Sequence, residues 1–241
     1  MKMTVKMQII ISALIAVALV LLPGCKKKDG SEAVKDVEGN VYETVTIGDQ
    51  VWMKENLRTG SYRDGSWLLT NLYADFEWAS AGPAYCIYHP TYIDGLDSES
   101  EVLDAYGILY NWFAVTDSRG LCPVGWRIPS EADWEELIDY LGGADVAGGK
   151  LKSKRTDPDA HPRWENPNAD ASDAEGFSAL PAGYRNSLGM YEGVGVYACW
   201  WSSTQYDANW AYSYYIYSGD SYIDLSNDRK RAGYSVRCIK E

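Results

Sequence analysis

A cysteine near the N-terminus carries the clearest chemical signal in this chain. Cys25 closes the segment 22–25 (Leu-Pro-Gly-Cys), which follows an apolar run over 9–22 and two early lysines. A basic start, an apolar run and a small residue before a cleavage point are typical of a secretory leader. The run is also shorter than the roughly 20 residues that a membrane span needs. We therefore expect residues 1–24 to be removed and Cys25 to be acylated, for example with palmitate; an uncleaved N-terminal anchor and a leader cut elsewhere are the alternatives.

Four cysteines remain if Cys25 is acylated. An even number in an exported chain predicts two disulfides, for which three pairings are possible. No two of these cysteines have the CxxC spacing of a zinc or thioredoxin-like site. The four are Cys86, Cys122, Cys199 and Cys238.

Oxygen-bearing side chains gather in the loop-like segment 157–173. Ca²⁺ takes about six to eight hard oxygen ligands, so this segment is a candidate calcium site. A loop that is simply solvated is the simpler interpretation, and we expect no other cofactor. The candidate ligands are Asp157, Asp159, Glu165, Asn166 and Asn168.

Aromatic residues are abundant, with 10 Trp and 19 Tyr against 3 Phe. The predicted strand 210–217 places three of them on one face, and Trp200 and Trp201 cannot both point inward from one strand. Exposed Tyr and Trp rings stack on sugars or anchor protein interfaces, whereas packing under long loops is the alternative. The candidate ligand-binding residues are Trp201, Trp210, Tyr212 and Tyr214.

Enzymatic chemistry has little support in the sequence. The only histidines, His89 and His161, lie in loop-like segments, too few for a histidine-ligated iron site. Cys199 and Cys238 are 39 positions apart, unlike the closely placed cysteines of a thiol oxidase. No serine has a nucleophile-elbow pattern. We therefore expect a protein that is not an enzyme.

The charge of the chain argues against nucleic acid as a partner. The full chain has 22 basic and 34 acidic residues. Removing residues 1–24 takes away two lysines and no acid, which leaves 20 against 34, a net charge of −14. Such a chain repels a phosphate backbone. A membrane contact is expected only through the lipid anchor.

The helices and strands predicted from the sequence, which must position these residues, are typical of one α+β domain with an antiparallel sheet, two main helices and long loops. Period-two alternation predicts a hairpin over 41–53, and Ser130 caps a helix over 131–141 with an apolar face at i, i+3, i+4 and i+7. The second helix is expected over 105–115. Strands are expected over 126–128, 179–180, 199–203, 210–217, 222–225 and 233–239, with a turn at 226–228. Residues 25–36 read as a flexible tether and 37–241 as the domain.

Six ordered segments carry a family resemblance. They include Cys122-Pro123-Val124-Gly125-Trp126-Arg127-Ile128-Pro129 and Tyr234-Ser235-Val236-Arg237-Cys238, and the others span 40–57, 106–115, 180–185 and 200–204. Over 37–241 the chain resembles the Fibrobacter succinogenes major paralogous domain, found in lipoproteins and surface proteins of Bacteroidetes and Fibrobacter. The family has no settled biochemical function.

A more remote resemblance concerns the fold. A strand, a proline and a Ser-Glu-x-x-Trp helix, followed at the far end by Tyr-Ser-Val-Arg-Cys, are similar to the C-type-lectin-like fold of formylglycine-generating enzymes. That likeness implies paired chain ends and a Cys122–Cys238 disulfide, with Cys86–Cys199 as the second. It also implies that loops form the ligand surface.

Together these patterns predict a lipid-anchored outer-membrane protein with a non-catalytic binding or adhesion domain. A glycan is the expected partner. A protein of an envelope assembly and a calcium-dependent ligand are the alternatives. The sequence leaves open whether the domain faces the periplasm or the exterior.

Overall fold

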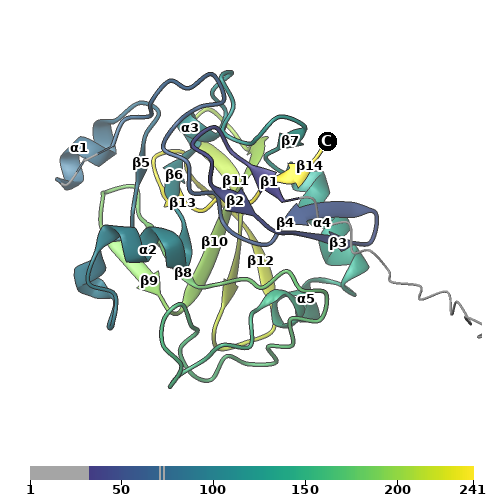
Figure 1. The fold of residues 1–241 in the computed structure, drawn as a ribbon. Helices are drawn as coiled ribbons and strands as arrows, with labels where there is room; N and C mark the ends of the chain where they lie inside the picture. Colours follow the sequence, from purple (N-terminus) through teal and green to yellow (C-terminus); the bar gives the residue numbers. More distant parts are fainter. Residues whose placement is uncertain (1–32, 71, 73) are drawn as a thin grey trace, which may run out of the picture. The chain divides into compact units, whose positions relative to one another are not determined.

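The computed structural model describes residues 33–70, 72 and 74–241 (Figure 1). The predicted acylation site Cys25, the leader 1–24 and most of the tether 25–36 lie outside these residues. Among the described helices, none has the length and apolar character to cross a membrane. The described part is mostly β-sheet with a few helices and long loops, so the α+β prediction holds at this level.

One eight-stranded sheet forms the centre of the domain (Figure 1). Its order is β12-β11-β10-β8-β13-β6-β5, with β9 paired to β8, and all contacts are antiparallel except β8 with β10. The strands are β5 (Tyr85–Cys86), β6 (Leu109–Asn111), β8 (Ala182–Arg185), β9 (Tyr191–Val194), β10 (Tyr197–Gln205), β11 (Trp210–Tyr217), β12 (Ile223–Arg229) and β13 (Gly233–Tyr234).

A four-stranded sheet joins the two ends of the domain. Its order is β3-β4-β14-β7, in which Ile239 pairs with both Trp52 and Arg127. The predicted hairpin is present as β3 and β4, whereas the residues before it pair separately as β1 and β2. The strands are β1 (Val34–Lys35), β2 (Val41–Tyr42), β3 (Thr44–Ile47), β4 (Gln50–Met53), β7 (Trp126–Arg127) and β14 (Ile239–Lys240).

The folded domain begins before the predicted boundary at residue 37. Val34 pairs with Tyr42, and the Tyr42 hydroxyl donates a 2.6 Å hydrogen bond to the buried carboxylate of Asp36. Because a tether would leave these groups in water, the end of the predicted tether 25–36 is wrong by at least three residues.

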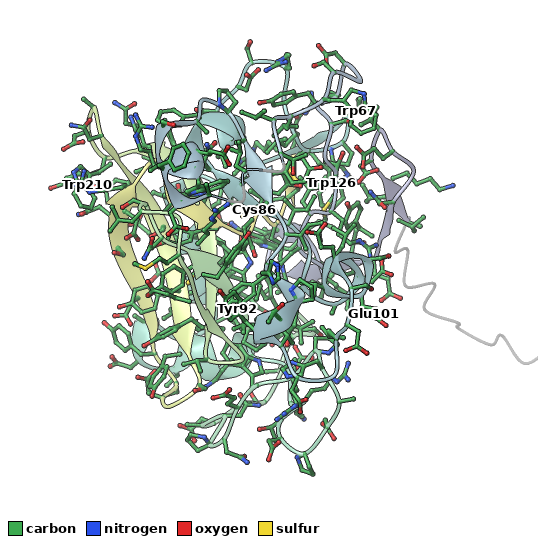
Figure 2. All side chains as sticks on the ribbon, turned by 90° about the vertical axis from the view of Figure 1, so that its left-hand side faces the viewer. Trp67, Cys86, Tyr92, Glu101, Trp126 and Trp210 are labelled. Atoms are coloured by element: carbon green, nitrogen blue, oxygen red, sulfur yellow. A yellow bond between two sulfur atoms is a disulfide. The ribbon has the colours of Figure 1, made fainter. Side chains whose placement is uncertain are left out.

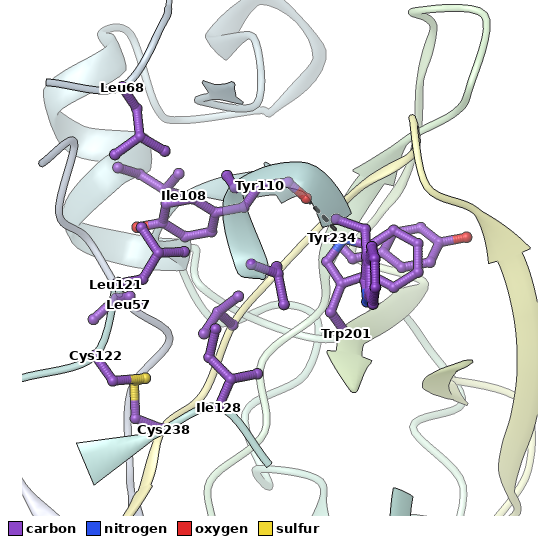
Figure 3. Packing of buried hydrophobic residues seen from close by; sticks show 14 of the residues in the cluster. Leu57, Leu68, Ile108, Tyr110, Leu121, Cys122, Ile128, Trp201, Tyr234 and Cys238 are labelled. Carbon is purple, nitrogen blue, oxygen red and sulfur yellow. Dashed lines mark hydrogen bonds between the residues drawn. A yellow bond between two sulfur atoms is a disulfide. The ribbon is translucent and has the colours of Figure 1, made fainter. Parts of the chain in front are cut away.

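A disulfide connects the loop before β7 to the closing strand region. Cys122 and Cys238 are bonded across 116 positions with their Cα atoms 6.0 Å apart, and both are buried in the main core (Figure 3). The pairing that the lectin-like resemblance implied is therefore confirmed.

The helix predicted over 131–141 is confirmed as α4 (Glu131–Tyr140). The Ser130 side chain accepts from the backbone N–H of Asp133, and the Asp133 carboxylate accepts in return from the backbone N–H of Ser130, which completes a capping box. The other helices are α1 (Asp75–Ser80), α2 (Glu99–Tyr106), α3 (Trp112–Val115), α5 (Ala144–Leu151) and the 3₁₀ turn η1 (Pro90–Tyr92).

The helix predicted over 105–115 is wrong. Gly107 ends α2 with φ of 80°, and a Cβ there would lie 2.9 Å from the Cβ of Asn56. The chain then forms β6 and the short helix α3. The apolar run reflects burial of a short central strand, which periodicity alone does not distinguish from a buried helix.

The C-terminal strands also differ from prediction. The expected turn at 226–228 lies inside β12, and the single strand expected over 233–239 divides into β13 and β14, which join different sheets. Instead of the strand expected over 179–180, β8 begins at Ala182. Helix α5 is not among the predicted helices, and it contains Gly148, where a Cβ would clash with the carbonyl oxygen of Tyr222.

The α4 capping box contributes stability that the domain loses at acid pH. Burial would raise the pKa of Asp133, but hydrogen bonds from Arg127 and Ser130 outweigh it and lower the pKa to about 2, from an ordinary value of 3.8. Because the folded pKa is the lower one, the carboxylate stabilises the fold above about pH 4, and this contribution is lost as the pH falls toward 2.

We expect the melting temperature of Asp133→Asn to fall less than that of the wild type between about pH 4 and pH 2. Asp139→Asn, at an exposed site on the same helix, should show the same fall as the wild type. Parallel curves for Asp133→Asn and the wild type would contradict this assignment.

Candidate ligand-binding pocket

A pocket of about 440 Å³ opens on one face of the large sheet. This volume is typical of small-molecule sites. Its lining comes from β8, β10, β11, β12 and β13 and the segments beside them. The lining residues are Tyr184, Asn186, Ser187, Tyr197, Cys199, Trp210, Tyr215, Ser226, Asp228, Arg229, Ala232 and Tyr234.

Strand register brings several of these side chains to one face. Cys199 on β10 pairs with Tyr215 on β11, and Tyr197 pairs with Tyr217. Since residues at i and i+2 of a strand share a face, Tyr197, Cys199 and Tyr215 point the same way. From β12, Ser226 pairs with Ser213 and so joins that face.

Four of the rings form what we call the tyrosine cage: Tyr184, Tyr197, Tyr215 and Tyr234. The Tyr234 and Tyr184 ring centroids are 5.8 Å apart with an interplanar angle of 84°. Tyr184 and Tyr197 are 6.3 Å apart at 69°, and Tyr197 and Tyr215 are 6.3 Å apart at 73°. Successive rings in the order Tyr234, Tyr184, Tyr197 and Tyr215 therefore meet edge to face.

Carboxylates lie beside three of the four cage tyrosines. The Tyr184 hydroxyl donates to Glu192 Oε2 at 2.6 Å, Asp224 is the cross-strand neighbour of Tyr215, and Asp228 lines the pocket with Tyr234 and accepts from the Ser213 hydroxyl at 2.6 Å. Burial and the neighbouring carboxylate raise the pKa of Tyr215 to about 12, and in the same way raise that of Tyr234 well above its usual value. Tyr215 and Tyr234 are therefore neutral at physiological pH, and the hydrogen bond to Glu192 fixes the direction of the Tyr184 hydroxyl.

The rim and the floor have different characters. At the rim, the Arg229 guanidinium carbon lies 5.0 Å from the centroid of Trp210, its cross-strand partner. At the floor, Cys199 is a buried free thiol whose pKa burial raises well above its ordinary value. The thiol is therefore un-ionised and unreactive.

The predicted Cys86–Cys199 disulfide is wrong, because both thiols are free and buried. Cys86 lies on β5, at one edge of the large sheet, and β8, β13 and β6 separate it from Cys199 on β10. Four strand spacings amount to about 19 Å, far beyond the roughly 7 Å that a disulfide spans between Cα atoms.

Of the aromatic residues predicted to bind a ligand, only Trp210 lines the pocket. Trp201 and Tyr214 are buried in the core, so their prediction as surface residues is wrong. Tyr212 is partly exposed and packs edge to face on Tyr206, with ring centroids 5.4 Å apart.

Contrary to expectation, Trp200 and Trp201 are both buried, because β10 is covered on both faces. Trp200 packs among Trp134 of α4 and Phe177, whereas Trp201 packs against Tyr234 and donates to the carbonyl oxygen of Tyr110 at 2.8 Å (Figure 3). Both indoles are 0% exposed.

The structure does not bring the predicted calcium ligands together. Asp157 forms an ion pair with Arg163, Asp159 accepts from the backbone N–H of Thr156, and Asn166 accepts from the Thr156 hydroxyl. Asn168 donates to the carbonyl oxygen of Ser153, and Glu165 packs beside Gly195. Within the described residues, no group of three or more His, Cys, Asp or Glu side chains is placed to hold a metal ion. The predicted calcium site is therefore corrected to a loop whose side chains contact other protein groups, although the buried Oδ1 of Asn168 has no hydrogen-bond partner in the described part of the chain.

The two histidines serve local structure. His161 Nδ1 lies 2.6 Å from the Tyr106 hydroxyl, which links the 157–166 loop to α2. His89 Nδ1 accepts from the backbone N–H of Thr91 at the start of η1.

Sequence reasoning missed the cage. Its members are separated by up to 50 positions, and the alternation Tyr197-x-Cys199 and Tyr215-x-Tyr217 was the only local signal. Which tyrosines face one another depends on the pairing of β10 with β11 and of β8 with β13, and neither is encoded locally.

Comparison with known proteins identifies one family. The model of the Fibrobacter succinogenes major domain matches residues 45–240. No curated protein and no solved structure matches.

Proposed function

We propose that this chain, which belongs to the Fibrobacter succinogenes major domain family, is a lipid-anchored, non-catalytic glycan-binding protein of the cell envelope. The observation that carries the proposal is the aromatic pocket with Trp210 at its rim. Sugar rings stack on such side chains, while a few polar groups orient their hydroxyls. Asn186, Ser226 and Asp228 offer donors and acceptors of that kind.

The envelope location is part of the proposal and depends on the leader pattern that ends at Cys25. Acylation of this cysteine would place the domain at the outer membrane. A disulfide between Cys122 and Cys238 suits an oxidising compartment.

We also propose that the domain is C-type-lectin-like. Two features support this: the chain ends pair in one small sheet, and a disulfide attaches the last strand region to the entry of the α4 unit. The pocket, however, lies on a face of the large sheet rather than in the loops.

Trp210→Ala is expected to weaken glycan binding at least about tenfold, because the rim loses its stacking surface. The measurement is a glycan array on the full chain, followed by calorimetry on each hit. Trp67→Ala is the matched control: Trp67 is 76% exposed and lies on the opposite side of the molecule from Trp210 (Figure 2). Equal loss in both variants, or none in either, would overturn the assignment of this pocket.

A second candidate function is protein binding in an envelope assembly. Phe76 on α1 is 74% exposed, and Leu188 and Met190 in the β8–β9 turn are 65% and 47% exposed. Gly189 brings that turn against Asp75, so the three side chains border one surface. If no glycan on the array binds, and a partner protein is cross-linked at Phe76, protein binding would be favoured.

A further inference from the structure

We propose that the tyrosine cage binds an organic ammonium ion, so that the glycan recognised is an amino sugar with a free amino group. The inference rests on the proposed glycan-binding function and narrows it to one class of ligand. Three features carry it: the arrangement of the rings, the charges behind them, and the position of the one cation at the pocket.

The cage has the shape that a compact cation requires. Each pair of neighbouring rings is separated by 5.8 to 6.3 Å and inclined by 69° to 84°. A cation between such walls approaches several electron-rich ring faces at once, which is how aromatic cages hold alkylammonium groups. Desolvation strengthens this attraction, and Cys199 and Ala232 add an apolar floor without a competing positive charge.

The charges behind the rings are negative. Glu192 accepts a 2.6 Å hydrogen bond from the Tyr184 hydroxyl, Asp224 is the cross-strand neighbour of Tyr215, and Asp228 lines the pocket with Tyr234. Within the part of the chain that the structure describes, no ion pair involves these three carboxylates. Their negative potential is thus available to a ligand.

The single cationic side chain of the lining lies at the rim. Arg229 is positioned over Trp210 rather than over the cage. An anionic ligand in the cage would be repelled by Asp228, which lines the pocket, and by Glu192 and Asp224 behind the rings, whereas an ammonium ion would be attracted by all three. A sugar that stacks on Trp210 can direct its amino group inward.

The test compares three tetrasaccharides by calorimetry on the full chain in detergent: glucosamine tetramer, its N-acetylated form and the glucose tetramer. We expect the free amine to bind at least about tenfold more tightly than the other two, and tetramethylammonium to compete with it. Asp228→Asn should lose most of this preference, and so should Tyr197→Leu, which removes one wall. Asp139→Asn, on the far helix α4, should keep it. Thermal melts of each variant separate a lost site from a lost fold.

The outcomes separate this inference from the function on which it rests. Equal affinity for the three tetrasaccharides, with all of them lost in Trp210→Ala, would overturn the ammonium site and leave glycan binding intact. Binding of tetramethylammonium without any sugar would support the ammonium site and overturn glycan binding. Binding of neither would overturn both.

Discussion

Removing the Cys122–Cys238 disulfide is expected to lower the free energy of unfolding by about 4–5 kcal/mol. The bond closes a loop of 116 positions, and in the chain-entropy model a loop of this length restricts the unfolded chain by that amount. Domains are stable by only about 5–15 kcal/mol, so the loss is a large fraction of the total. The measurement is denaturant unfolding of the Cys122→Ala, Cys238→Ala double variant.

The control for this experiment is Cys86→Ala. Cys86 is also a buried cysteine, but it forms no disulfide, so its replacement removes a thiol without removing a cross-link. The excess loss in the double variant then measures the cross-link. If the double variant loses no more unfolding free energy than twice the loss of Cys86→Ala, the disulfide adds nothing to stability.

The second large effect is expected from Trp200→Ala, at about 3–5 kcal/mol. The Trp200 indole is 0% exposed and lies within 6.0 Å, between ring centroids, of both Trp134 and Phe177. Its Nε1–H donates to Asn56 Oδ1 at 2.9 Å, so truncation leaves a cavity and removes a donor from a buried acceptor. Chemical denaturation measures the change.

Two variants interpret that result. Trp200→Phe retains most of the packing but not the donor, and should cost about 1–2 kcal/mol. Trp67→Ala removes the same side chain from an exposed position and should change stability by less than about 0.5 kcal/mol. Similar costs for Trp200→Ala and Trp67→Ala would mean that Trp200 is not part of a packed core.

The elements that the sequence predicts best are those whose causes are local. Helix α4 begins where Ser130 and Asp133 cap each other, and its apolar face recurs at helical spacing. The hairpin β3–β4 turns at Gly48, whose φ of 58° suits a tight turn. Both follow from residues only a few positions apart.

Predictions that depended on distant partners failed. Whether 105–115 forms a helix depends on the pairing of β6 with β13, more than 100 positions later. Whether Cys86 can reach Cys199 depends on how many strands lie between them. Contacts between strands that are far apart in the sequence leave no periodic pattern of residues in the chain.

The sequence by itself determined the family, the capped helix, the acidic charge and the cysteine pattern from which a disulfide could be expected. The tertiary structure alone decided which aromatic residues line the pocket. Trp201 and Tyr214 lie in the core because the large sheet is covered on both faces, while Tyr184, Tyr197, Tyr215 and Tyr234 meet because four strands are paired in one register. The physical reason is that side-chain direction alternates along every strand, so the composition of a face is set only when the strands are aligned.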